Sequence, residues 1–574
     1  MTEPNSAGTK GASAELSRWL PIVGWLPRYE NRWWRPDLLA GLTVWALLVP
    51  EAMAYAEIAG MPAEAGLYAA LGAIVGYALF GTSRQLFVGP SSTVAILSAG
   101  TVAAVATGDD WADVTILLAV MVGVMLIALG VLRLGFISVF MSKPVLTGFT
   151  FGLGLVIAVG QLNKLFGVEG GDGNFFEQLW AVARQLPDAD LRTTLIGLGA
   201  LAILLVSRKF FGHKVPMALI VVFGAILLSS ILDWEADGVH VVGEIPASLP
   251  SLTVPNLSGG QIAELAGGAL GIVLIAFAES FGTARNFARR RRYEIDANQE
   301  LIAMGAANVG SGLLGGFAVD GSLSRSSAAD EAGAMSQMAM LICGVITVVT
   351  ILALTPIFEQ LPEAILGAVV ISAVWGTFNV AELRRVYSAN RGDFAAAAAA
   401  LVGVCTIDLL PGLVLAVLTS FTLLVYRASR PGMPTLGHLP GGDYYVSMAR
   451  EPAAIPPEGV TVVRLDAPLI FANAEAFHAR VVDVVDAADP PPLGVVIDLE
   501  TVDTIDTDGG DELRSIKDEL DERGVQLAIS RLNFEGREAL RSNDVYDRIG
   551  DDMFFPTIDG AVRALTAAAQ RDGN

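Results

Sequence analysis

The amino-acid sequence predicts a polytopic α-helical membrane protein that ends in a small α/β domain. Of its 574 residues, 53% are hydrophobic and only 17% are charged, and the mean hydropathy is +0.55. A bilayer core about 30 Å thick requires roughly 20 apolar residues for each helical span. Stretches that meet or approach this length recur from Leu38 to Leu424, and Ile116–Leu132 carries no charge at all. The helices of a soluble enzyme would instead show one apolar and one polar face.

The membrane part divides into two sets of seven segments, fourteen in all. Because basic residues favour the cytoplasmic side, a cytoplasmic N-terminus is indicated by Arg133 and by the run Arg289–Arg292. Lys164, Arg184 and Arg192 are exceptions in one outer loop. The even number of spans returns the C-terminus to the cytoplasm, so we expect a multi-pass protein of the plasma membrane with both termini inside. The expected regions are a cytoplasmic segment 1–36, a first seven-span repeat 37–232, an extracellular connection 233–260, a second seven-span repeat 261–429 and the α/β domain 435–574.

Two halves with an odd number of spans must be inverted relative to each other, as in many secondary transporters. Val88–Thr93 and Gly315–Ser326 each open the third segment of their half with Gly, Ser and Pro residues. A helix N-terminus offers unpaired N–H groups and roughly half a positive charge, so two such ends at mid-membrane predict an anion site without a metal. Small residues that merely allow close helix packing are the alternative. The candidate anion-binding side chains here are Ser91, Ser92, Thr93, Ser324, Arg325 and Ser326.

Glu51 and Glu279 lie in the first spans of the two halves. Ionisable residues inside a membrane are costly and are functional candidates by default. A bare carboxylate would repel an anion, and burial favours its neutral form. We therefore expect proton–anion symport, with Glu279 as the coupling residue; a structural ion pair between a glutamate and Arg325 is the alternative. Thr283, one helical turn after Glu279, would also suit sodium as the coupling ion.

Other classes of function find little support in the sequence. A GxxxxGK[ST] phosphate loop is absent, and neither Cys343 nor Cys405 has the spacing of a disulfide or metal site. We recognise no nucleophile–base pair, so an enzyme and a resident cofactor are not expected. Residues 435–574 contain 27 Asp and Glu but 12 Lys and Arg, which is −15 of the net −22 and argues against nucleic acid as a partner.

The C-terminal region alternates between short apolar runs and amphipathic helices. Val460–Leu465, Leu493–Leu499 and Val525–Ile529 are predicted strands, and Asp511–Arg523 is a predicted charged helix. This alternation predicts a small α/β domain.

Six motifs follow one another along the membrane part: Pro50–Ala56, Ala59–Pro62, Gly66–Tyr68, Val88–Pro90, Asn298–Leu301 and Gly321–Ser326. In this order they resemble the SulP (sulfate permease) family of anion transporters, and the tail around Val502–Asp508 resembles a STAS domain (sulfate transporter and anti-sigma antagonist). The resemblance implies a fold of fourteen spans with a core and a gate domain, an elevator mechanism and a homodimer.

The same resemblance assigns residues to roles. It implies that the anion binds between the third and tenth spans, near Glu51, Tyr55, Ser91, Thr93, Ser324 and Arg325. Glu279 and Thr283 match the family's cation-coupling positions. This sequence departs from many relatives at Glu51, where they have Gln, at Ser91, where they have a bulky aromatic residue, and at Asp320, where a neutral residue is common. These departures favour coupled uptake of an anion larger or more hydrated than chloride.

The function expected from the sequence is therefore import of sulfate, bicarbonate or a C4-dicarboxylate, with sulfate favoured by the family's name. Anion exchange or channel-like conduction is an alternative, and a membrane-bound sensor whose STAS domain has a cytosolic partner is another. Thr507 follows Asp506 and precedes Asp508. A phosphate there would be crowded by like charges, so we interpret Thr507 first as a helix N-terminal residue and second as a regulatory phosphosite.

Overall fold

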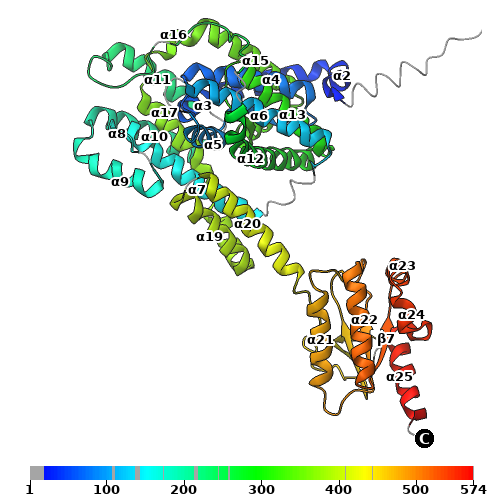
Figure 1. Cartoon of the computed structure of the whole chain (residues 1–574). Helices are drawn as coiled ribbons and strands as arrows, with labels where there is room; N and C mark the ends of the chain where they lie inside the picture. Colours follow the sequence, from blue (N-terminus) through cyan, green and yellow to red (C-terminus); the bar gives the residue numbers. More distant parts are fainter. Residues whose placement is uncertain are drawn as a thin grey trace, which may run out of the picture. The chain divides into compact units, whose positions relative to one another are not determined.

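The computed structural model describes residues 19–106, 110–135, 143–171, 173–211, 217–243, 245–255, 259–407, 409–441 and 444–572. Residues 1–18 of the expected N-terminal segment lie outside these ranges. The chain forms two compact units, Met1–Ser420 and Phe421–Asn574 (Figure 1). The first unit is helical and the second contains the α/β domain, as the sequence predicts.

The first half of the helical unit contains seven segments with one short strand. They are α3 (Trp34–Ile58), α4 (Ala63–Phe80), β1 (Phe87–Gly89) with α5 (Ser92–Ala103), α6 (Trp111–Val131), α7 (Lys143–Gly160), α10 (Leu191–Phe211) and α11 (Met217–Leu232). The short helices α8 (Leu162–Phe166) and α9 (Phe175–Gln185) lie between α7 and α10, and α2 (Pro21–Trp25) precedes α3.

The second half repeats this order. Its segments are α12 (Gly259–Arg291), α13 (Ala297–Leu313), β2 (Asp320–Ser322) with α14 (Leu323–Glu331), α15 (Met338–Val349) continued by α16 (Thr355–Phe358), α17 (Glu363–Val374), α19 (Arg391–Thr406) and α20 (Leu409–Ala428). The amphipathic helix α18 (Val380–Ala389) joins α17 to α19. In both halves the third segment is a short strand followed by a short helix.

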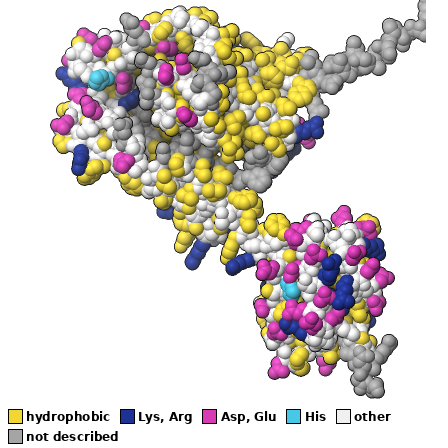
Figure 2. All heavy atoms as spheres, viewed as in Figure 1, with side chains coloured by type: hydrophobic (Ala, Val, Ile, Leu, Met, Phe, Trp, Pro, Cys, Tyr) yellow, Lys and Arg dark blue, Asp and Glu magenta, His cyan; other side chains and the backbone are white. Residues whose placement is uncertain are grey.

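Among the described residues, seven helices are long and apolar enough to cross a membrane. Shorter apolar helices, among them Ser92–Ala103 and Glu363–Val374, account for further segments. Hydrophobic side chains cover much of the visible surface of the helical unit, whereas charged groups dominate that of the C-terminal domain (Figure 2). The polytopic helical fold is therefore confirmed.

Helix packing reproduces the repeat. One bundle, which we call the core bundle, contains α3–α6 and α12–α15; a second, the gate bundle, contains α7, α10, α11, α17 and α19. Each helix of one half can be replaced by the helix at the same place in the other half. The contact of α3 with α15 then corresponds to that of α12 with α6, the contact of α4 with α15 to that of α13 with α6, and the contact of α10 with α17 to that of α19 with α7. All of these pairs are in contact. The bundles thus have the internal symmetry expected of an inverted repeat.

The basic exceptions of the outer loop have partners. Lys164 on α8 forms an ion pair with Glu57 at the end of α3, and Arg192 forms one with Asp237. The guanidinium of Arg184 lies 4.9 Å from the centroid of the Trp180 ring. These contacts explain how the positive charges are accommodated on the side of the protein that the charge distribution assigns to the exterior.

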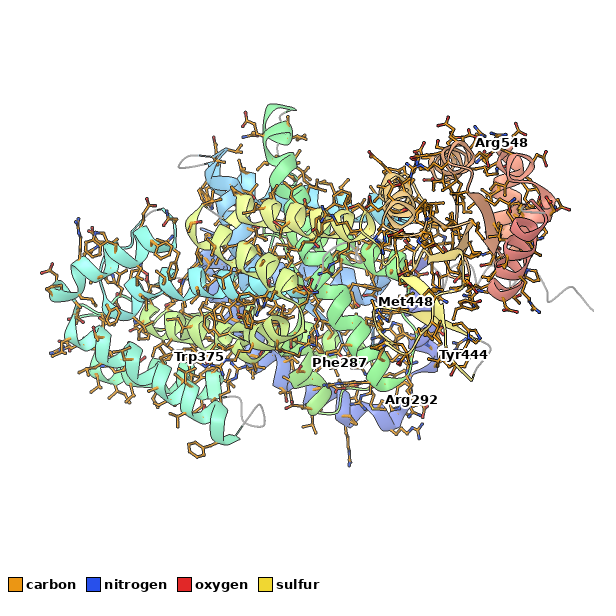
Figure 3. All side chains as sticks on the ribbon, turned by 90° about the horizontal axis from the view of Figure 1, so that it is seen from below. Phe287, Arg292, Trp375, Tyr444, Met448 and Arg548 are labelled. Carbon is orange, nitrogen blue, oxygen red and sulfur yellow. The ribbon has the colours of Figure 1, made fainter. Side chains whose placement is uncertain are left out.

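The basic run Arg289–Arg292 lies at the C-terminal end of α12. Phe287 is buried against the helical unit, whereas Arg292 is exposed beyond the end of the helix (Figure 3). Arg292 has a φ of 57°, the left-handed backbone conformation that commonly stops a helix.

The C-terminal domain has a six-stranded sheet in the order β4-β3-β5-β6-β7-β8. Strands β5 to β8 are parallel, and β3 and β4 are antiparallel at one edge. The strands are β3 (Thr435–His438), β4 (Tyr445–Ser447), β5 (Val460–Arg464), β6 (Gly494–Asp498), β7 (Gln526–Ser530) and β8 (Phe554–Phe555). The helices are α21 (Ala474–Asp486), α22 (Thr507–Glu522), α23 (Phe534–Ser542), α24 (Val545–Ile549) and α25 (Ile558–Asp572).

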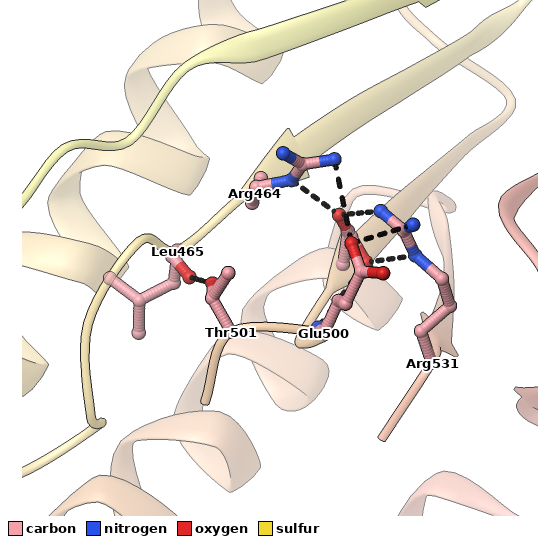
Figure 4. A network of polar contacts seen from close by, with 6 residues as sticks. Arg464, Leu465, Glu500, Thr501 and Arg531 are labelled. Carbon is pink, nitrogen blue, oxygen red and sulfur yellow. Dashed lines mark hydrogen bonds and ion pairs between the residues drawn. The ribbon is translucent and has the colours of Figure 1, made fainter. Parts of the chain in front are cut away.

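Alternation along the strands builds two apolar layers. Val463 and Ile497 pack with α21 and α22 on one face of the sheet, and Val462 and Val496 pack with α25 on the other (Figure 1). At the end of β6, the fully buried carboxylate of Asp498 is held by two arginines. Arg464 Nε donates at 2.7 Å and Arg531 Nε at 2.8 Å, while Arg531 also reaches Glu500 (Figure 4).

The segment at the end of α20 and just after it forms hydrogen bonds with this domain through four backbone carbonyls. The carbonyl of Ala428 accepts a hydrogen bond from Asn473 Nδ2 (3.3 Å), and that of Met433 accepts one from Arg480 Nε (3.3 Å). The carbonyls of Gly432 and Pro434 accept hydrogen bonds from the backbone amides of Asp466 (2.9 Å) and Arg464 (3.1 Å). The last turns of α20 accordingly belong to the same compact unit as the domain.

Close approach of α4 and α13 gives a first prediction. A Cβ at Gly72 would lie 2.3 Å from the backbone carbonyl carbon and oxygen of Gly310, which cannot move without displacing a helix. Gly72→Ala should destabilise the protein by about 1–3 kcal/mol or more, seen as a lower melting temperature of the detergent-purified chain. Gly199→Ala is the control, because a Cβ there meets nothing within 4 Å and alanine is the better helix former. Equal melting temperatures for the two variants would contradict the packing.

The charge of His478 gives a second prediction. His478 on α21 contacts Glu512 and Glu519 of α22 through its two ring nitrogens, and Glu519 also pairs with Arg523. Burial alone lowers the pKa of His478, but the hydrogen bonds and charges of the two carboxylates outweigh it, so the pKa of His478 is raised above its ordinary value. The protonated histidine therefore stabilises the α21–α22 contact fully below the unfolded-state pKa, and this stabilisation is lost as the pH rises through the folded-state pKa.

Amide hydrogen exchange of the full-length chain checks this expectation. After correction for intrinsic rates, α21 and α22 should be better protected at about pH 6 than at about pH 8. His478→Gln should remove the difference, whereas His438→Gln, on strand β3, should leave it in place. Protection that is independent of pH in the parent protein would show that the contact does not depend on the histidine charge.

Candidate functional site

The site is built on two strands from opposite halves of the chain. β1 pairs antiparallel with β2, with Phe87 opposite Ser322, Val88 opposite Gly321 and Gly89 opposite Asp320. Each strand leads directly into a helix, α5 or α14. Because the strands are antiparallel, the two helices leave in opposite directions and their N-termini face each other across the short ladder.

Polar side chains hold both strands in place. Ser326 Oγ accepts the Phe87 amide (2.9 Å), Ser280 Oγ accepts the Gly321 amide (2.7 Å), and Asn308 of α13 both accepts from the Val319 amide and donates to its carbonyl (2.9 Å each). The backbone groups next to the ladder are thus satisfied within the membrane unit, as a protein in lipid requires.

The loop before β1 is fixed by a buried carboxylate. Glu300 on α13 accepts the amides of Thr82 (2.7 Å) and Ser83 (3.1 Å) and the hydroxyl of Tyr77 (2.7 Å). Gln337 donates to the carbonyls of the same loop. The Asn298–Leu301 motif noted in the sequence therefore contributes structure, by holding the entry to β1.

Serine side chains cap both helices. Ser91 Oγ accepts the Val94 amide at 3.4 Å, and Ser322 Oγ accepts the Arg325 amide at 3.3 Å. Capping satisfies one orphan donor in each first turn and leaves the positive end of each helix directed at the ladder. Serine is the residue type expected at this position.

Arg325 is the most unusual side chain of the site. It is 1% exposed, and its nearest acidic partner is Glu51, whose Oε2 lies 3.5 Å from Nη1. Its Nε and Nη2 groups are buried and have no hydrogen-bond partner among the described residues. Leaving buried charged donors unsatisfied costs about 1–3 kcal/mol each or more. A buried guanidinium with two unused donors, between two helix N-termini, is therefore suited to bind an anion.

Three acidic side chains lie at this site, two of them facing Arg325. Glu51 is buried beside it on α3, and Asp320 of β2 is 1% exposed, with both carboxylate oxygens lacking a hydrogen-bond partner among the described residues. Glu279 of α12 faces Asp320 and Thr93. Asp320 in turn faces Ser91 and Arg325 as well as Glu279.

The structure brings most of the sequence-predicted residues together. Tyr55, one turn after Glu51, is buried beside Ser92, Glu51 and Arg325, and Thr93 is buried beside Glu279. Glu51, and not Glu279, is the ion-pair partner of Arg325.

The remaining predicted residues differ in their surroundings. Ser324 is exposed and contacts Ser322 at 3.0 Å, whereas the Ser326 hydroxyl is occupied by β1. Thr283 is buried one turn beyond Glu279 on the same helix. Thr507 stands apart as the exposed first residue of α22, which is capped by Asp506.

Several contributors were not among the predicted site residues, among them Ser280, Asn308 and Asp320. Ser280 anchors β2, and a lone serine on an apolar helix carries no sequence signal of that role. Asp320 was noted only as an unusual acid, and the strand pairing that buries it is not visible in a three-residue segment. An inspection of acids inside apolar segments could have found Asp320.

Comparisons with known proteins agree over nearly the whole chain. Residues 34–400 match the sulfate permease family and residues 451–561 match the STAS domain. A "Probable sulfate transporter" of Mycobacterium tuberculosis is 35% identical over 95% of this chain and 98% of its own. The chloroplastic sulfate transporter 4.1 of Arabidopsis thaliana is 29% identical over 96% and 83%.

Solved structures share the fold. The murine Solute Carrier 26 family member A9 anion transporter superposes with a TM-score of 0.88 at 23% identity, covering 99% of this chain and 96% of its own. The transmembrane domain of a cyanobacterial bicarbonate transporter, BicA, gives a TM-score of 0.60 at 22% identity, covering 68% and 98%.

The unused donors of Arg325 lead to a third prediction. Arg325→Gln should weaken binding of sulfate to the purified chain by at least about tenfold, since hydrogen bonds to charged groups contribute about 1.5–3 kcal/mol. Arg325→Lys should recover only part of the loss, because an ammonium lacks the planar fork of donors. Binding is measured as the sulfate-dependent rise in melting temperature. Arg285→Gln, an exposed arginine of α12, is the matched control, and wild-type affinity in Arg325→Gln would exclude this arginine from the site.

Proposed function

This chain belongs to the sulfate permease family and is an anion transporter, and from that premise we propose that it imports a small anion, sulfate first, by proton-coupled symport. The observation that carries the proposal is Arg325, buried with two unused donors between two helix N-termini. Backbone N–H groups and one guanidinium suit an oxyanion such as sulfate, bicarbonate or a carboxylate. The sulfate transporters among the relatives favour sulfate within this class.

The charges around Arg325 support coupling to protons. Glu51 and Asp320 face Arg325, and Glu279 faces Asp320, so the site has a formal charge of −2 when all three carboxyl groups are ionised. A buried site with excess negative charge repels an anion. Uptake of protons, or of another cation, removes that repulsion at the moment of binding. Glu279 is the group we assign to this step, because Glu51 already faces the arginine; sodium, held with Thr283, is the other coupling ion to be tested.

The arrangement of the site supports an elevator mechanism. Glu51, Ser91, Glu279 and Arg325 lie on or next to α3, α5, α12 and α14, which all belong to the core bundle. The core bundle can therefore carry the anion and its proton past the gate bundle as one body. Glu57 lies on α3, which moves with the core bundle, and its partner Lys164 lies on α8, outside that bundle. Each movement of the core bundle must then break this ion pair.

We also infer the location, the assembly and the regulation of the protein. The charge distribution supports a plasma-membrane location with both termini in the cytoplasm, and the family supports a homodimer. Thr507 is the exposed first residue of α22, which supports its role as a helix N-terminal residue first and as a regulatory phosphosite second; a cytosolic protein remains the proposed partner of the STAS domain.

Proteoliposomes containing the full chain test the function directly. Labelled sulfate, bicarbonate and malate are supplied in turn, with an inward proton gradient, with an inward sodium gradient, and with neither. We expect sulfate uptake driven by the proton gradient. Uptake that needs only a counter-anion inside would indicate exchange, and a current that persists without any cation gradient would indicate conduction; either result would overturn symport.

The coupling residue gives a fourth prediction. Glu279→Gln cannot bind or release the proton, so uptake should lose its dependence on the proton gradient while exchange of labelled for unlabelled anion continues. Glu264→Gln, an exposed glutamate on the same helix, is the matched control and should behave as the parent does. Proton dependence that survives in Glu279→Gln would remove Glu279 from the coupling step.

A further inference from the structure

Asp320 is a buried acid whose carboxylate makes no hydrogen bond among the described residues, although Glu279, Ser91 and Arg325 face it. Only 1% of the residue is exposed, and neither carboxylate oxygen accepts a hydrogen bond within the described residues. A buried ionised carboxylate in that state is strongly unfavourable, and most such groups are neutralised by a proton or a cation. Nothing in the anion-binding role of the site uses this group, since a carboxylate cannot donate to an anion.

The backbone prevents Asp320 from moving away from its neighbours. The amide before it, Val319, donates to Asn308 Oδ1 at 2.9 Å, and the amide after it, Gly321, donates to Ser280 Oγ at 2.7 Å. Asp320 itself lies in the ladder opposite Gly89. Because Ser280 directly follows Glu279 on α12, this bond keeps β2 next to α12, where the side chains of Asp320 and Glu279 face each other.

Glu279 and Asp320 face each other within the site. The groups that face Asp320 are Glu279, Ser91, Arg325 and Tyr55, and those that face Glu279 are Asp320 and Thr93. Among the described residues, the acid that forms an ion pair with Arg325 is Glu51. Glu279 therefore faces a second acid and not the arginine, and two carboxyl groups that face each other can share one proton.

We propose that Glu279 and Asp320 form a buried acid pair that holds one proton, and that Asp320 is the residue that makes Glu279 take up this proton at the working pH. The proposal rests on the proposed function and deepens it by identifying a second residue of the coupling site. In each cycle one proton from the outer solution binds the pair together with the anion, and the same proton leaves to the cytoplasm when the anion does. Asp320 acts through Glu279, so it is a positioning residue rather than a ligand of the anion.

The test is the pH profile of sulfate uptake into proteoliposomes that contain the full-length chain. Asp320→Asn removes the like charge and keeps the shape, so the external pH for half-maximal uptake should move to lower pH by about one unit or more, a tenfold rise in the proton concentration required. The KM for sulfate at saturating acidity should stay within about twofold, because Arg325 and the helix N-termini are intact. Asp320→Glu restores the carboxyl and should return the profile towards that of the parent.

Matched controls separate this effect from damage to the fold. Asp113→Asn, an exposed acid on α6, should leave the profile unchanged. Exchange of labelled for unlabelled sulfate at acidic pH shows that each variant is folded and active. A profile of Asp320→Asn that coincides with the parent's would overturn the acid pair, and so would an equal shift in Asp320→Asn and Asp320→Glu, which would indicate a loss of packing.

The failure of this inference is distinguishable from failure of the proposed function. If Glu279→Gln loses proton dependence but Asp320→Asn has an unshifted profile, symport stands and the pair is wrong. If the parent protein responds to a sodium gradient and not to pH, both proposals are overturned.

Discussion

Three residues from each half of the chain, Phe87–Gly89 and Asp320–Ser322, pair as antiparallel strands inside the helical bundle. Each backbone polar group left unsatisfied in lipid costs several kcal/mol, so neither broken segment is stable at this depth without the other. The pairing, together with the Ser326, Ser280 and Asn308 side chains, satisfies the strands and directs two helix N-termini at one place. The placement of the two helix N-termini, the proposed anion site and the position of Asp320 all depend on it.

Sequence patterns predict the framework of this site well and its contacts poorly. The matching motifs at Val88 and Gly315 predict two broken segments in corresponding places, because Gly, Pro and Ser interrupt apolar runs visibly. The strand pairing is not predictable, since three residues are too few for the alternation that identifies a strand. For the same reason the domain's longer strands β5, β6 and β7 were predicted, while the short strand β8 was not.

The sequence also does not predict which side chains pair with each other. Glu51 and Glu279 occupy equivalent positions in the repeat, so the sequence alone cannot tell which of them faces Arg325. The fold separates them: the ion pair goes to Glu51, and Glu279 faces a second acid. The same charge therefore has different consequences in the two halves. Glu51 is therefore the partner of the arginine, and the proposed coupling role falls to Glu279.

The connection between α20 and the STAS domain bears on regulation. Four hydrogen bonds, accepted by the carbonyls of residues 428, 432, 433 and 434, fix this stretch to the domain. The stretch therefore belongs to the folded domain and is not a free linker, and the last turns of α20 lie in the same compact unit. A change in the STAS domain that breaks these bonds would consequently be felt first at the end of α20.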